Sequence, residues 1–161
     1  MSLAESGAPD GFSAFLSLAP QPLHSALVIA SRLQDADQRD RLVESALTID
    51  RSDLNSRDIQ LLTRYAKRVP RTDAGSKAKR WSAIGSPAAK WLCAALLEEL
   101  SAYDNAAEIL ASINDSTWEE ERALRLLALA RTTIRAGRIS DAVLPLRHAA
   151  QAARTAQTLH L

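Results

Sequence analysis

Two stretches of the chain repeat one arrangement of residues 36 positions apart. The first runs from Pro87 to Asn114 and the second from Ala123 to Ala150. The aligned pairs are Tyr103 with Ile139, Ala106 with Ala142, and Leu110 with Leu146. A period in the mid-thirties, with a small residue where two helices cross, is typical of a helical-hairpin repeat. Because such repeats bind other macromolecules, the pattern favours a binding protein over an enzyme.

The composition predicts an all-α fold. The 161 residues are 47% hydrophobic but only 4% aromatic, so the core must be built mainly from Ala and Leu, which are good helix formers. Together with the repeat, this predicts a right-handed α-solenoid of antiparallel helical hairpins. We expect a disordered lead over residues 1–10 and a repeat domain over 11–161, with irregular hairpins in 11–85 and regular tetratricopeptide-like hairpins in 86–161.

Apolar periodicity and capping residues give the expected helices. They cover about 23–34, 37–49, 53–69, 77–84, 87–101, 104–113, 116–136 and 140–158, after a short apolar turn between Phe12 and Leu18. Residues 70–76 are predicted to form a loop. Ser86-Pro87 and a capping box from Ser116 to Glu119 are the sharpest start signals, and Gly137 is a stop signal. Pro145 is expected to bend the last helix.

Charge is segregated along the chain, although the net charge is only +1. Residues 64–90 hold eight Lys or Arg and one acid, 98–121 hold eight acids and no base, and 122–161 hold seven Arg and one acid. Segregated charge produces local electric fields even when the total is near zero. The pattern fits either a docking surface or helix faces that are simply solvated.

The basic segment supplies the candidate partner-binding residues, which are Arg64, Lys67, Arg68, Arg71, Lys77, Lys79 and Arg80. Tyr65 and Trp81 are interleaved with them, as in some nucleic-acid-binding segments, but both aromatics fall on apolar helix faces. We therefore expect an acidic protein surface as partner in preference to nucleic acid, with a solvated helix face as the alternative.

Neither a catalytic nor a metal site is predicted, and we expect no cofactor, no small-molecule substrate and no enzyme activity. The histidines His24, His148 and His160 have no metal-ligand spacing with one another or with Cys93. Cys93 lies in an apolar helix and is expected to be a small core residue, and Glu119–Glu121 are expected to interact with a helix dipole. A single cysteine excludes an internal disulfide and fits a reducing compartment. The sequence indicates neither a signal peptide nor a membrane span, so we expect a cytoplasmic and nuclear protein.

The last helix carries an apolar face. Its members are Leu146, Ala149, Ala150, Ala153, Ala156 and Leu159. A solenoid needs its terminal apolar face covered. We expect either a longer protein, of which this chain is a fragment, or a partner to cover it.

Both hairpins resemble tetratricopeptide-type repeats. The second matches better, at Leu126, Leu129, Ala130, Gly137, Ile139, Ala142, Leu146 and Ala149. The order of segments over about residues 25–155 also resembles the COP9 signalosome subunit 4 family. This resemblance is carried by L-N-S-R-D-I-Q-L-L-T-R-Y-A at 54–66, by the hairpin at 90–113, and by the Leu- and Ala-rich helices that follow.

The resemblance implies a non-catalytic scaffold subunit of the COP9 signalosome. Its partners would be other signalosome subunits and a cullin–RING ligase, and the complex would remove a ubiquitin-like modifier from cullins. The chain departs from the family at Arg135-Ala136-Gly137-Arg138, where the family has an acidic turn. The family's winged-helix PCI module is not found within these 161 residues, so we expect either an N-terminal fragment or a match to the fold alone. A proteasome-lid PCI subunit and a bacterial tetratricopeptide-type adaptor or regulatory arm that binds a peptide or effector are the alternatives.

Overall fold

The computed structural model describes residues 22–113 and 119–159, and these residues form helices and no strand. The all-α prediction is confirmed for this part of the chain. The chain divides into two compact units at Arg51/Ser52. The predicted lead, the apolar turn at 12–18 and the capping box at Ser116 lie outside the described residues.

The first unit contains α2 (Pro22–Ala30) and α3 (Ala36–Ile49), which pack against each other. Asp35 caps α3, because its side chain accepts a hydrogen bond from the Gln38 amide at 3.0 Å. The Leu23 amide donates to Asp50 Oδ2 at 3.2 Å, which ties the start of α2 to the end of α3. Helix α2 is shorter than the expected 23–34, because a turn follows Ala30.

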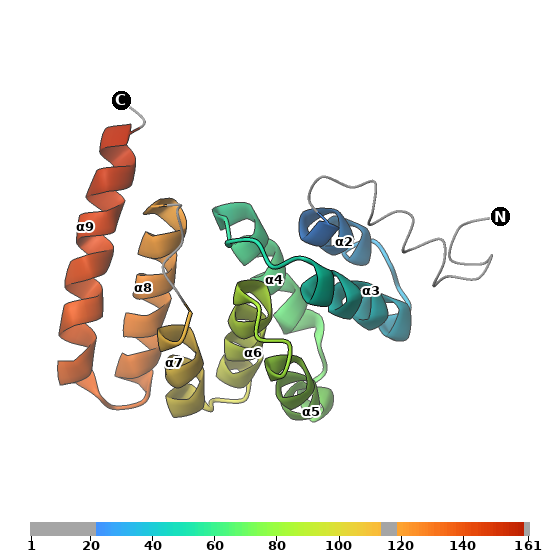
Figure 1. Cartoon of the computed structure of the whole chain (residues 1–161). Coiled ribbons are helices and arrows are strands. Elements are labelled where there is room, and N and C mark those ends of the chain that lie inside the picture. The colour runs from blue at the N-terminus through green and yellow to red at the C-terminus, as the bar shows by residue number, and fades with distance from the viewer. Residues whose placement is uncertain (1–21, 114–118, 160–161) are drawn as a thin grey trace. The chain divides into compact units, whose positions relative to one another are not determined.

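The second unit contains the remaining helices. They are α4 (Ser56–Arg68), α5 (Arg71–Ser82), α6 (Pro87–Glu99), α7 (Tyr103–Ala111), α8 (Glu119–Arg135), the 3-10 helix η1 (Ile139–Ala142) and α9 (Val143–Leu159). From α5 to α9, each α-helix packs on the next, and α4 packs on both α6 and α8. In Figure 1, α7, α8 and α9 lie side by side in chain order.

The predicted loop at 70–76 is wrong, because Arg71–Ser82 is one helix. Pro70 precedes the first turn, where its missing N–H costs nothing, and the apolar residues Ala74, Ala78 and Trp81 follow at helical spacing and are buried. Gly75 sits inside this helix. Burial of the face that carries Trp81 outweighs the helix-breaking tendency of that glycine, which is about 1 kcal/mol relative to alanine.

The predicted start of α6 is confirmed. The Ser86 side chain accepts from the Ala89 amide at 3.2 Å, and Pro87 occupies the first helical position. By contrast, α7 begins at Tyr103 without a side-chain cap, although Asp104 was expected to start it. The last helical segment opens with η1, which places Pro145 in the first turn of α9, where proline is tolerated.

The 36-residue repeat is also a repeat of backbone conformation. At the end of α6, the Ser101 and Ala102 amides donate to the carbonyls of Glu98 and Leu97; at the end of α8, Gly137 and Arg138 donate in the same way to Ile134 and Thr133. Both are Schellman turns, with a left-handed residue at φ 60° for Ser101 and 84° for Gly137. The next residues also agree, since Ala102 has φ −86° and ψ 64° and Arg138 has φ −102° and ψ 65°.

The small residues at the aligned helix crossings are buried as expected. Ala106 on α7 and Ala142 at the end of η1 are both almost inaccessible to solvent. A side chain no larger than a methyl group lets two helices approach closely, so the alanines fix how α7 and α9 meet their neighbours. These two positions are where the packing in the two hairpins is most alike.

Candidate functional site

Four of the predicted basic residues gather where α4 passes into α5. Arg64, Lys67 and Arg68 lie on the last turns of α4 and are exposed, and Arg71, also exposed, begins α5 two residues after the α4 cap. We call these four residues the basic turn. Lys67 and Arg68 also sit at a helix C-terminus, where the helix dipole favours positive charge. The nearest acid in sequence is Asp73, which is exposed in the first turn of α5.

The other three predicted residues do not belong to this cluster. Lys79 and Arg80 are exposed in the last turn of α5, eight and nine residues after Arg71, which is about 12–14 Å along a helix axis. Lys77 is partly buried, with Nζ 5.8 Å from the centre of the Trp81 ring. The predicted single basic segment is therefore two groups of bases at opposite ends of α5.

Sequence reasoning missed Arg57. It is exposed in the first turns of α4 and precedes Arg64 by seven residues, which places it on the same helix face. The seven-residue spacing was visible in the sequence. The acid Asp58 follows Arg57 directly, so the local sequence does not stand out as basic. Asp58 is buried and takes part in the Asn55 cap, so it adds no exposed negative charge to this face.

The aromatic residues of the basic segment are core residues. Tyr65 is 5% exposed and Trp81 is 1% exposed, and their ring centres lie 6.1 Å apart. Stacking on nucleic-acid bases requires exposed rings. The expectation that both aromatics face inward is confirmed, and the basic turn offers charge without a stacking platform.

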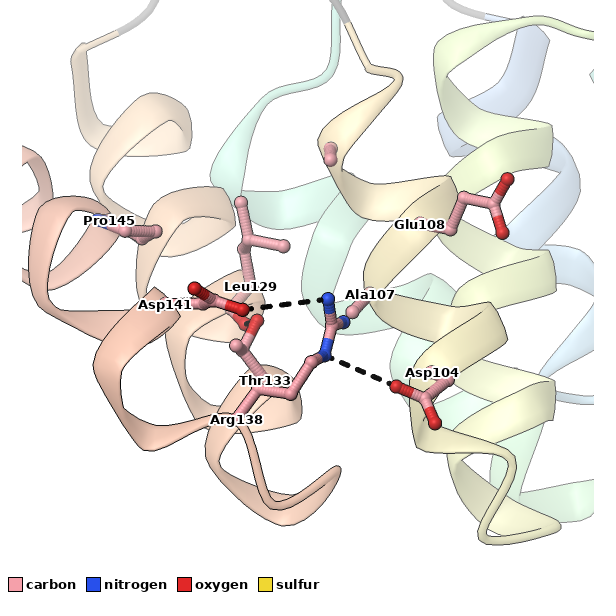
Figure 2. A pocket seen from close by; sticks show the side chains of 9 residues that line it. Asp104, Ala107, Glu108, Leu129, Thr133, Arg138, Asp141 and Pro145 are labelled. Carbon is pink, nitrogen blue, oxygen red and sulfur yellow. Dashed lines mark hydrogen bonds and ion pairs between the residues drawn. The ribbon is translucent and has the colours of Figure 1, made fainter.

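A groove of about 500 Å³ runs between α7 and the α8–α9 hairpin (Figure 2). Ala107 and Leu129 contribute apolar surface, and Arg138 reaches across it to Asp104, with Nε 3.2 Å from Oδ1. A second contact joins Arg138 Nη1 to Asp141 Oδ2 at 3.9 Å. Arg138 is held by two carboxylates that are themselves exposed, so polar contacts join the successive hairpins at this groove. Exposed ion pairs of this kind contribute modestly to stability.

Cys93 is confirmed as a core residue. It is inaccessible to solvent, its Sγ donates to the Ala78 carbonyl at 3.2 Å, and burial raises the pKa of its thiol to about 12. A thiol with such a pKa stays protonated near neutral pH and is a poor nucleophile. Across residues 22–113 and 119–159, no group of three or more His, Cys, Asp and Glu could hold a metal ion.

Glu121 has a different environment from the one its position suggests. Its side chain is 1% exposed and lies 3.5 Å from Arg125 Nε, which is 4% exposed, so the pair is buried within α8. The sequence predicted only an interaction with the helix dipole. A buried pair of this kind makes α8 intolerant of losing one partner, because the remaining charge would be desolvated without compensation.

No protein-family model, curated protein or solved structure gives a significant match to this chain. Among the helices that the structure describes, none is both long enough and apolar enough to cross a membrane. The function is therefore inferred from the repeated hairpins and from the exposed bases of α4 and α5.

Proposed function

We propose that this chain is a non-catalytic scaffold whose helical hairpins form a right-handed, tetratricopeptide-like α-solenoid and bind other proteins. The observation that carries the proposal is the agreement of two helix ends 36 residues apart, in hydrogen bonds and in the dihedral angles of Ala102 and Arg138. Recurrence of one supersecondary unit at a fixed period is what defines repeat proteins, and these use their extended surfaces for binding.

The basic turn is the surface that we assign to a partner. Its four cations are exposed and close together in the chain, and Arg57 extends the same face of α4. Clustered charge of one sign raises the association rate with a surface of the opposite sign. Since the nearby rings are buried, an acidic protein surface is the better match and nucleic acid the weaker one.

The test uses two labelled probes, a 20-residue poly-glutamate peptide and a single-stranded oligo-dT of equal length. We expect the peptide to bind and to weaken as salt rises, because the interaction is between exposed charges. The double variant Arg64→Glu/Lys67→Glu should lose about tenfold or more in affinity. The matched control Arg32→Glu/Arg41→Glu makes the same charge change at exposed sites of the first unit and should lose less than about threefold.

Equal losses in the two double variants would show that net charge, and not the basic turn, governs binding. Tighter binding of oligo-dT than of poly-glutamate at matched salt would replace the protein partner with nucleic acid. Circular dichroism of each variant checks that the helices are retained, which we expect since all four substituted side chains are exposed.

The narrower hypothesis, a subunit of the COP9 signalosome that contributes to binding cullin–RING ligases, stays a prediction from the resemblance. Its test is a pull-down with purified signalosome subunits and a cullin–RING ligase, using the wild-type chain and the Arg64→Glu/Lys67→Glu variant. Specific retention that the variant loses supports this assignment. Failure to retain any of these proteins would exclude a signalosome subunit and would leave the broader proposal of a repeat scaffold. A proteasome-lid subunit and a bacterial adaptor are then the other candidates.

A further inference from the structure

One end of the α8–α9 hairpin exposes large apolar side chains. Ile134 on α8 is 41% exposed, Ile139 in η1 68%, and Val143 and Leu146 on α9 51% and 41%. We call these four residues the end face. A partner that covered these side chains would gain about 25 cal/mol of binding free energy for each Å² of apolar surface removed from water.

The internal repeat shows what kind of element packs on the equivalent positions of the first hairpin. Shifting the end face back by 36 residues gives the positions Glu98, Tyr103, Ala107 and Leu110. At those positions the contacts are made with α8. The Thr132 hydroxyl donates to Glu98 Oε1, Arg131 lies 3.7 Å from Glu98 Oε2, and the Arg135 guanidinium sits 5.9 Å from the centre of the Tyr103 ring.

The aligned exposures make the same point. Ala107 is 3% exposed and Leu110 is 2% exposed, whereas their counterparts Val143 and Leu146 stand about half in solvent. Because the two hairpins share their backbone turns, the difference comes from the neighbour: α8 packs on α7, and within the second unit no further described helix packs closely on α9. The end face therefore corresponds to the positions that pack against a helix in the first hairpin.

The side chains of the end face differ from those that α8 contacts in the first hairpin, so a helix bound there must differ from α8. The position that is Glu98 in the first hairpin is Ile134 in the second, so the occupant must present apolar side chains where α8 presents Thr132 and Arg131. Helix α9 also carries Arg147 and Arg154 and no Asp or Glu. Arg147 is exposed and aligns with Ala111, which lines the groove between α7 and α8, so it borders the end face.

We infer that the end face binds an amphipathic helix of a partner protein, with an apolar stripe flanked by acidic residues. The stripe would cover Ile134, Ile139, Val143 and Leu146, and the acids would face the bases of α9. A second copy of this chain fits less well, because packing two α9 helices together would bring arginines toward arginines with no acid on either helix. The inference does not depend on the basic turn, which lies on other helices.

The test uses two synthetic 18-residue helical peptides with one shared Leu/Ala stripe, one flanked by Glu and the other by Lys. Fluorescence anisotropy should show binding of the Glu peptide, with the Lys peptide weaker by about tenfold or more. Leu146→Asp should weaken the Glu peptide by at least about tenfold, since it places a charge against the apolar stripe. Ile49→Asp, at a 55% exposed site on α3, is the matched control and should change the affinity by less than about twofold.

Charge is tested separately with Arg147→Glu, which should weaken the Glu peptide and strengthen the Lys peptide. Arg41→Glu, at an exposed site on α3, is its control and should leave the preference unchanged.

Equal affinity for the two peptides, or binding of neither, would overturn the inference. So would a concentration-dependent dimer in sedimentation that Leu146→Asp dissociates, because the occupant would then be a second copy. Loss of poly-glutamate binding through the basic turn changes none of these outcomes, so the two proposals fail separately.

Discussion

The α6–α7 and α8–α9 hairpins have matching backbone turns and different surroundings. Both first helices end in a Schellman turn, and both crossings use a buried alanine, Ala106 or Ala142. Beyond the crossing they diverge: the first hairpin buries Leu110 against its neighbours, and the second leaves Leu146 exposed. The comparison shows that the same backbone turn forms with either serine or glycine at its left-handed position, whereas burial of a helix face depends on what packs on it.

The largest test of this comparison truncates the two aligned leucines. Leu110→Ala should lower the free energy of unfolding by about 2–5 kcal/mol, since it removes a buried side chain and leaves a cavity. Leu146→Ala should cost less than about 1 kcal/mol, because its side chain is 41% exposed. Urea denaturation followed by circular dichroism measures both. Similar losses would show that Leu146 is covered in solution.

A second test substitutes the residues with positive φ at the ends of α6 and α8. Gly137→Ala should destabilise the chain by about 1 kcal/mol, because φ 84° is strained for a residue with a Cβ. Ser101→Gly should stabilise it by up to about 1 kcal/mol, since it relieves the same strain at φ 60°. Thermal denaturation resolves the opposite signs. A loss of stability in Ser101→Gly would mean that the Ser101 side chain contributes more than its strain costs.

The helix starts offer a third contrast, because α6 has a side-chain cap and α7 has none. Ser86→Ala should cost about 1 kcal/mol, since the Ala89 amide loses its acceptor. Ala102→Ser is the complementary change at the uncapped start of α7 and should have an effect within about 0.5 kcal/mol, because Ala102 already serves in the Schellman turn. Equal effects at the two sites would contradict the assignment of Ser86 as the cap.

The smallest effect concerns pH. The pKa of the Cys93 thiol is about 12 when folded, against 9.0 for an unperturbed thiol. A raised folded-state pKa contributes stability that is complete below pH 9 and is lost as pH rises toward 12, because only the unfolded chain then releases the proton. We expect a decrease of a few tenths of a kcal/mol in the free energy of unfolding on going from neutral pH to about pH 9. Cys93→Ala, compared at both pH values, should show no such thiol-dependent decrease.

The sequence predicted the helical class, the Ser86 cap, the Gly137 stop and the inward aromatics, because each rests on local propensity or on one strong signal. It failed over the first half of α5, where Pro70 and Gly75 favoured a loop, whereas the burial of Ala74, Ala78 and Trp81 favours one continuous helix. It also gave no sign that Ser101 would adopt a left-handed conformation that usually selects glycine.

The candidate site was predicted in part. Helical spacing within α4 identified Arg64, Lys67 and Arg68 correctly as one exposed group. The separation of Lys79 and Arg80 from them follows from the length of α5, of which the sequence predicted only the second half, from 77 onward. The apolar residues of α9 were recognised, but periodicity cannot tell which of them a neighbouring helix covers, so the end face required the structure.

The most direct test is the solvent accessibility of aligned positions in the two hairpins. Single variants Leu110→Cys and Leu146→Cys are labelled with a thiol reagent under native conditions, and the buried Cys93 serves as an unreactive internal reference. We predict labelling at position 146 at least about a hundredfold faster than at position 110, because only the latter requires local opening. Equal rates at the two positions would contradict the claim that aligned positions of the two hairpins differ in exposure because only the first is covered by a neighbouring helix.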